Sequence, residues 1–228
     1  MAKGKKETQT QEFESVQNAL SKSEAFVEKN KTMLLGGLIV VIVVVCAALL
    51  YRNHVSIPRE QEAHEAIFGA EQLFARDSFQ LALDGNGKDL GFLAIIDEFG
   101  STEAGNLARA YAGVSYKMLG EYEKAISYLN KFSASDMSLS PALKGAIGDC
   151  YLEMGDKNKA VSFFQKAADS NNDVIAPTYL FRMGLLYLSM GENQKALSAF
   201  EKIKNQYFTS QLATDIDKYI QLATLKQQ

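Results

Sequence analysis

One segment of seventeen residues occurs three times in this chain, and it restricts the fold more than any other feature. The copies cover residues 113–129, 148–164 and 184–200, so successive copies are offset by 35 and then 36 residues. The shared positions are Gly113, Gly148 and Gly184, then Tyr116, Tyr151 and Tyr187, then Gly120, Gly155 and Gly191, then Ala125, Ala160 and Ala196, and last Leu129, Phe164 and Phe200. A fixed period near 34 residues, with two helical patterns per unit, is typical of a helix–turn–helix solenoid. The sequence therefore predicts an all-α fold.

Each repeated position has a physical role in this interpretation. The first glycine has no Cβ and predicts the close approach of another helix, and the tyrosine one turn later fills the core beside it. The second glycine suits the left-handed residue that ends a helix. The alanine marks a tight helix–helix contact, and the following Leu or Phe anchors the second helix. Pro141 and Pro177 are predicted to open first helices, with Ser140 as a cap.

The repeated residues resemble the tetratricopeptide repeat over about residues 106–208, and we expect three such repeats in residues 105–208. The usual tryptophan of the first helix and the proline that closes a repeat are absent from the three copies. The resemblance implies that the first helices line a concave groove for protein partners. The residues predicted to line it, about 100° around these helices from the core face, are Ala110, Val114, Lys117, Gly145, Asp149, Leu152, Phe181, Leu185 and Leu188.

The apolar far end of this groove has two interpretations. Phe181, Leu185 and Leu188 would hold an extended or helical segment of a partner, or they would pack under the C-terminal helix. That helix, in residues 209–228, is predicted to cap the open end of the solenoid. Residues 53–104 are predicted to form a degenerate opening helix pair, with one long helix from Pro58 to the turn at 84–87 and a second ending near Gly100.

An uncharged apolar stretch from Met33 to Tyr51 predicts a transmembrane helix in residues 32–52. Its 19 residues would span about 28 Å at 1.5 Å per residue, close to the roughly 30 Å hydrocarbon core of a bilayer. A buried core helix is disfavoured because the stretch is apolar on every face. A cleaved signal peptide is disfavoured because the preceding tail is long and no small-residue cleavage motif follows. Lipid attachment at Cys46 is disfavoured because Val45 is the wrong preceding residue and four more apolar residues follow.

Lysine residues predict the orientation of this span. Residues 1–31 carry six lysines, whereas the twenty residues after Tyr51 carry only Arg52 and Arg59. The positive-inside rule then places the N-terminus in the cytoplasm and exports the repeats. The tail contains a short amphipathic pattern at Phe13, Val16, Leu20 and Val27, which would lie on the inner membrane face, bind a partner or form a partly frayed helix.

The remaining composition argues against chemistry. The chain has two histidines, His54 and His64, and no phosphate-binding loop or nucleophile motif, so we expect no enzyme, no metal site, no cofactor and no small-molecule substrate. The net charge of −3 disfavours nucleic acid as a partner. Residues 53–228 contain 17 Lys and Arg against 22 Asp and Glu, a net charge of −5.

The whole chain resembles the YfgM-like ancillary subunits of the Sec translocon. The resemblance rests on the order of tail, span and repeats, on "EFESVQNALSKSEAFVEKNK" (residues 12–31), and on residues 93–129 leading into the first clear repeat. It implies a single-pass protein of the bacterial inner membrane with a periplasmic repeat domain, whose partners are translocon subunits, chaperones or exported chains. Two alternatives stay open: a scaffold of another envelope complex, in cell division or outer-membrane assembly, and an organelle import receptor with cytosolic repeats.

Overall fold

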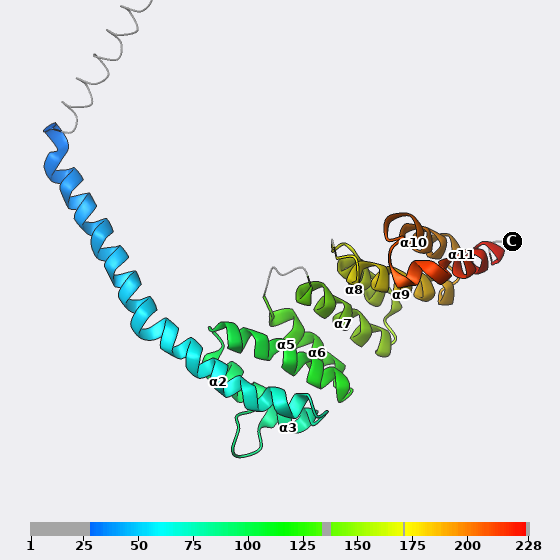
Figure 1. Cartoon of the computed structure of the whole chain (residues 1–228), viewed down its shortest axis with the longest axis horizontal. Helices are drawn as coiled ribbons and strands as arrows, with labels where there is room; N and C mark the ends of the chain where they lie inside the picture. Colours follow the sequence, from blue (N-terminus) through cyan, green and yellow to red (C-terminus); the bar gives the residue numbers. More distant parts are fainter. Residues whose placement is uncertain (1–27, 134–137, 171, 227–228) are drawn as a thin grey trace, which may run out of the picture. The chain divides into compact units, whose positions relative to one another are not determined.

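The computed structural model describes residues 28–133, 138–170 and 172–226, and the regular elements in these residues are all helices (Figure 1). The amphipathic pattern predicted in the N-terminal tail lies outside them. The chain divides into two compact units, Met1–Pro58 and Arg59–Gln228. The second unit contains the three sequence copies, so the candidate binding surface belongs to it.

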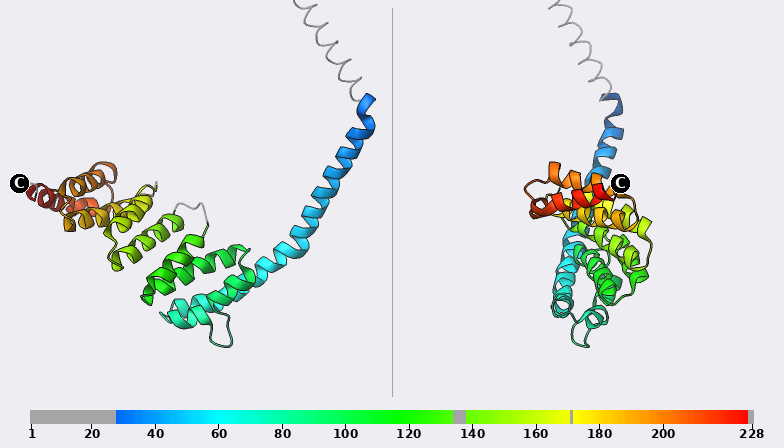
Figure 2. Two further views of the ribbon diagram at one scale, coloured as in Figure 1. Left: turned by 180° about the vertical axis from the view of Figure 1, so that it is seen from behind. Right: turned by 90° about the vertical axis from the view of Figure 1, so that its right-hand side faces the viewer.

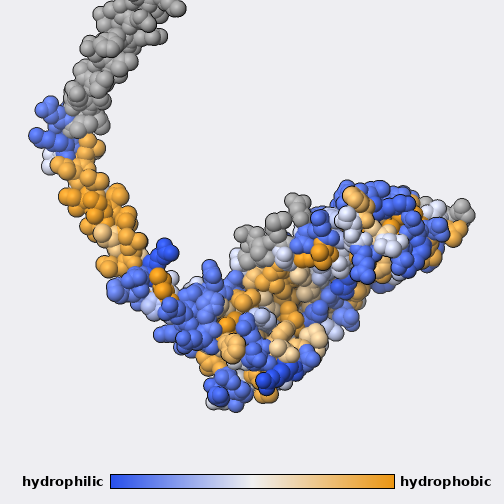
Figure 3. All heavy atoms as spheres, in the orientation of Figure 1, coloured by the Kyte–Doolittle hydropathy of each residue, from blue (hydrophilic) through white to orange (hydrophobic). Residues whose placement is uncertain are grey.

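The described part of the first unit is helical from Glu28, and its stretch from Met33 to Tyr51 is apolar on all sides. The helix includes a π-helical segment η1 (Arg52–Ser56) and continues beyond this unit to Phe74. The side chains of its apolar window are exposed, with none buried against the rest of the protein, and they form the continuous apolar stretch visible in Figure 3. A long, uncovered apolar helix near the N-terminus is therefore present as expected.

The opening of the second unit differs from the predicted helix pair. Three helices are found: α2 (Ile57–Phe74), α3 (Phe79–Asp84) and α4 (Phe92–Phe99). The prediction of one helix from Pro58 to the turn at 84–87 is wrong, because the chain turns between Phe74 and Phe79, where Asp77 has a φ of 56°.

Aromatic packing gives a physical reason for this break. With the helix interrupted, the Phe74 ring lies edge-on to Phe79, with ring centroids 5.4 Å apart, and edge-on to Tyr111 of the next helix at 5.0 Å. Five positions apart in one helix, the two phenylalanines would lie on different faces. The turn predicted at residues 84–87 is present, with positive φ at Gly85 and Gly87.

A single carboxylate joins α2 to the first repeat helix. The two oxygens of Glu60 accept hydrogen bonds from the backbone N–H groups of Glu103 and Ala104, at 2.9 and 3.0 Å. These donors belong to the first turn of α5, which has no intrahelical acceptors for them. Glu60, which lies 3.5 Å from His64, therefore acts as a helix cap supplied from a distant part of the sequence.

Three pairs of helices follow, one for each copy. The pairs are α5 (Glu103–Met118) with α6 (Tyr122–Lys131), α7 (Leu139–Glu153) with α8 (Lys157–Ala168), and α9 (Ile175–Ser189) with α10 (Asn193–Gln206). The two helices of each pair pack side by side, and α6 and α8 each also pack on the first helix of the next pair, as Figure 2 shows from two directions. A short 3₁₀ segment η2 (Gln211–Asp215) and α11 (Ile216–Leu225) then cover α10.

The first glycine of each copy receives the last residue of the same copy. A Cβ at Gly148 would lie 2.6 Å from the ring of Phe164, and a Cβ at Gly113 would lie 2.5 Å from the side chain of Leu129. Gly184 stands in the same relation to Phe200. The glycines are therefore required by large side chains of the second helices, which confirms the predicted close approach.

Proline opens two of the first helices, as predicted, but the predicted cap is wrong. Pro141 and Pro177 are the third residues of α7 and α9, where no intrahelical bond to the N–H group is needed. Ser140 does not cap α7, because that helix begins one residue earlier, at Leu139 after Ser138.

The second glycine of each copy ends the first helix in the left-handed conformation. Gly120, Gly155 and Gly191 have φ of 79°, 81° and 74°. In the middle copy, Gly155 N–H donates to Leu152 O at 3.0 Å and Asp156 N–H donates to Tyr151 O at 2.9 Å. This pair of hydrogen bonds is the Schellman motif, so the predicted helix ends are confirmed.

Replacing Gly155 with alanine should lower the free energy of unfolding by about 1–2 kcal/mol. No atom lies near the position of the added Cβ, so the cost is that of placing an L-residue in the left-handed region. Urea unfolding of the full chain in detergent measures it, beside Asn158→Ala on the exposed first turn of α8 as the control. An unchanged midpoint for Gly155→Ala would contradict this account of the turn.

Candidate partner-binding surface

Two of the residues predicted to line the groove are covered by neighbouring helices. Ala110 is buried in a cluster with Leu143 and Ile147 of α7, and a Cβ on Gly145 would overlap the ring of Tyr179 from α9. Their prediction as groove residues is therefore wrong. At this position successive first helices touch one another, and a helical wheel of one copy does not reveal the neighbouring copy.

The C-terminal helix covers part of the predicted apolar end. Phe181 is half-buried, and the Tyr219 ring of α11 lies edge-on to it at 4.8 Å. Leu188 is half-buried in the same cluster, whereas the side chain of Leu185 remains 39% exposed. For Phe181, packing under the C-terminal helix is therefore the interpretation that the structure supports.

The other predicted positions lie at the surface of α5 and α7. Val114, Lys117, Asp149 and Leu152 are all partly exposed. Together with Leu185 they form what we term the first-helix face, a mixed surface of apolar side chains around one central carboxylate. Whether this face binds a partner remains a prediction.

A shared carboxylate connects three consecutive first helices across this face. Asp149 of α7 lies 3.1 Å from the Lys117 ammonium of α5, measured to Oδ2, and 2.5 Å from the Arg182 guanidinium of α9, measured to Oδ1. The side chain of Asp149 is only 14% exposed. The Arg182 guanidinium also lies over the ring of Phe164 at 5.0 Å. Both cations are thus held in place by groups of the protein itself.

Sequence reasoning missed Arg182, although a signal was available. Asp149 follows Lys117 by 32 residues and precedes Arg182 by 33, both close to the repeat period. Opposite charges at repeat-length spacing on first helices would have indicated ion pairs between copies. The groove pattern, taken one helix at a time, placed position 182 outside the face.

Burial favours the neutral forms of two groups beside this face, the Cys150 thiol and the Tyr179 hydroxyl. It raises the pKa of the Cys150 thiol to about 11, and it also raises the pKa of Tyr179, to which the charge of Asp149 adds. A thiol with this pKa is protonated at neutral pH and is a poor nucleophile. Among the described residues no cluster of three or more potential metal ligands occurs.

We expect Asp149→Ala to lower the free energy of unfolding by about 1–2 kcal/mol. The change leaves two partly buried cations without their counter-charge, and the full cost of breaking a buried pair is reduced here because both cations reach solvent. Asp217→Ala is the control, because its bond to Lys204 joins two exposed side chains and should contribute less than about 0.5 kcal/mol. Urea unfolding compares them, and equal losses would contradict the central role of Asp149.

Comparisons with known proteins give the family of the repeats. Models described as "Tetratricopeptide repeat" match residues 108–135, 142–174 and 178–207. The chain contains tetratricopeptide repeats. The matched segments coincide with the α5/α6, α7/α8 and α9/α10 pairs, and arrays of such repeats present extended surfaces to protein partners. The chain is therefore a scaffold for protein–protein interaction.

Two solved structures are similar to the chain. One, titled "Crystal structure of MamA protein", has 21% sequence identity and a TM-score of 0.48, and the match covers 72% of this chain and 91% of that one. The other, titled "Crystal structure of MamA", has 23% identity and a TM-score of 0.41, with 60% and 88% covered. A comparison with curated proteins found no match.

Proposed function

We propose that this protein is a membrane-anchored tetratricopeptide-repeat scaffold at the outer face of the bacterial inner membrane. Its N-terminus lies in the cytoplasm, its repeats lie in the periplasm, and it associates with the Sec translocon and with periplasmic chaperones during protein export. The observation that supports the membrane anchor is the uncharged helical stretch from Met33 to Tyr51, in which the side chains are exposed from one end to the other.

The support for the anchor is energetic. Twelve residues of this stretch are Leu, Ile or Val, and each contributes about −0.3 to −0.6 kcal/mol to insertion into a bilayer. The sum, about −4 to −7 kcal/mol, would be lost if the helix stayed in water. The excess of lysine in the preceding tail supports the orientation, and the order of tail, span and repeats supports the link to the translocon.

The support for the binding role comes from the first-helix face. Leu185 is an exposed leucine in the middle of a helix whose neighbouring residues are largely buried. An aliphatic side chain of this kind provides binding energy when a partner removes it from water. Lys117 and Arg182 are both bound to Asp149, so neither is free to pair with a charged group of a partner. The face therefore suits a partner segment that brings apolar side chains.

Co-purification tests this function. Gently solubilised membranes containing the full chain with a C-terminal tag should yield translocon subunits and periplasmic chaperones, and Leu185→Asp should reduce their recovery at least fivefold. Circular dichroism melts establish whether the variant is folded, and Leu81→Asp is the matched control because Leu81 is an exposed leucine of α3. Undiminished recovery with folded Leu185→Asp, or recovery of division or outer-membrane assembly proteins instead, would contradict the proposal.

A further inference from the structure

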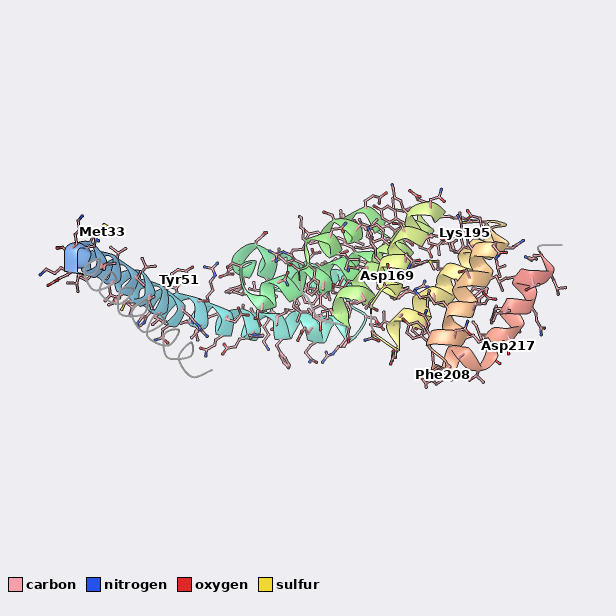
Figure 4. The ribbon with its side chains drawn as sticks, turned by 90° about the horizontal axis from the view of Figure 1, so that it is seen from above. Met33, Tyr51, Asp169, Lys195, Phe208 and Asp217 are labelled. Atoms are coloured by element: carbon pink, nitrogen blue, oxygen red, sulfur yellow. The ribbon has the colours of Figure 1, made fainter. Side chains whose placement is uncertain are left out.

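A pocket of about 650 Å³ lies where the start of α9 meets the segment that joins α10 to α11. Its walls include Val174, Phe181 and Leu212, with residues 209–211 along one side. Val174 is 76% exposed although it immediately precedes a helix of the core. Phe208, next to the pocket wall in sequence, is 73% exposed and lies at the edge of the unit beyond α10 in Figure 4. Apolar side chains thus line part of an open cavity, and polar side chains line the rest.

The rim of this pocket carries one carboxylate without a cationic partner. Asp173 lines the pocket, and among the described residues no lysine or arginine pairs with it. Burial raises the pKa of Tyr207, and the charges of Asp173 and Asp169 raise it further. Arg182, the cation of the pocket wall, is already bound to Asp149.

We propose that this pocket binds an extended segment of a partner protein in which a bulky apolar side chain is flanked by lysine or arginine. The apolar side chain enters between Val174, Phe181 and Leu212, and a cation faces Asp173. This inference rests on the proposed function and specifies the class of segment that the scaffold receives.

Size and polarity agree with an extended peptide. A cavity of several hundred Å³ accommodates one or two large side chains. The hydroxyl and amide groups of Thr178, Ser210 and Gln211 at the wall are suited to hydrogen bonds with peptide backbone. The net charge of −5 on residues 53–228 adds a long-range attraction for basic chains that salt would weaken.

Fluorescence polarisation with a defined probe tests this proposal. The probe is a labelled peptide with one phenylalanine between two pairs of lysines in a glycine–serine background, and the protein is the full chain in detergent. Val174→Ser should weaken binding about fivefold and Asp173→Asn about three- to fivefold at about 0.1 M salt, with the Asp173 effect falling below about twofold at 0.5 M. The matched controls are Leu225→Ser and Asp97→Asn, because both residues are exposed and lie outside the pocket.

The outcomes separate this inference from the proposed function. A peptide with glutamate in place of lysine, and one with serine in place of phenylalanine, should each bind at least tenfold more weakly. The inference is overturned if the glutamate peptide binds as tightly as the lysine peptide. It is also overturned if the control variants weaken binding as much as Val174→Ser and Asp173→Asn do. If the probe does not bind while Val174→Ser lowers the molecular mass in light scattering, a second copy occupies the pocket and the inference fails. If the original chain does not bind the probe but still co-purifies with translocon subunits and chaperones, the inference fails and the proposed function stands.

Discussion

Replacing Gly184 with leucine is expected to lower the free energy of unfolding of the repeat unit by about 3 kcal/mol or more. The added Cβ would overlap the ring of Phe200, which is completely buried. The ring has no room to move, because Phe181 and Tyr219 lie against it with centroids 6.0 and 5.6 Å away. The overlap must therefore separate α9 from α10 and loosen the covering α11.

Urea unfolding followed by circular dichroism measures this loss. The control is Gln194→Leu, an exposed position on α10, where a change within about 0.5 kcal/mol is expected. Combining Gly184→Leu with Phe200→Ala should be at least 1 kcal/mol less destabilising than the sum of the two single changes, because the new side chain fills the space of the lost ring. Additive losses would show that the two residues do not share one contact.

Replacing both Ile39 and Ile42 with arginine is expected to abolish membrane insertion. One arginine at the centre of a span costs roughly 3 kcal/mol, which the favourable sum of about −4 to −7 kcal/mol from Leu, Ile and Val exceeds. Ile42→Arg alone should therefore reduce membrane retention only in part. The double change costs about 6 kcal/mol and removes two favourable residues, so the balance becomes unfavourable.

Fractionation and a reporter measure the two halves of this prediction. Membrane and soluble fractions are compared for the two arginine variants and for Ile39→Leu with Ile42→Leu, which should insert as the original chain does. An enzymatic reporter fused after Gln228 should be active only on the exported side when the span is intact. Reporter activity on the cytoplasmic side of a stably inserted protein would show that the orientation is the opposite of the proposed one.

The sequence was sufficient for the repeats because their signals are local. A glycine after a helix favours the left-handed conformation because it has no Cβ, so Gly120, Gly155 and Gly191 could be interpreted from spacing alone. The break after Phe74 could not, because it depends on the ring of Tyr111 from another helix and on the unusual φ of Asp77.

The candidate surface was predicted less well for a related reason. A helical wheel gives the angle of a side chain but not which neighbour covers it. Ala110 and Gly145 share one angle and are covered by the next first helix, and Phe181, at the same angle, is covered by α11. The contact between Arg182 and Asp149 also joins two copies, so a helical wheel of a single helix could not reveal it.

The position of Asp149 bears on how the array comes apart. In a linear array, stability is approximately the sum of each unit's own stability and the coupling to its nearest neighbours, so the ends fray first. Asp149 contributes to both couplings of the middle pair at once, through Lys117 on one side and Arg182 on the other. Fraying of α9 would leave a carboxylate that is 14% exposed with one of its two cationic partners. The shared carboxylate thus favours concerted opening of the three pairs over the stepwise loss of one end.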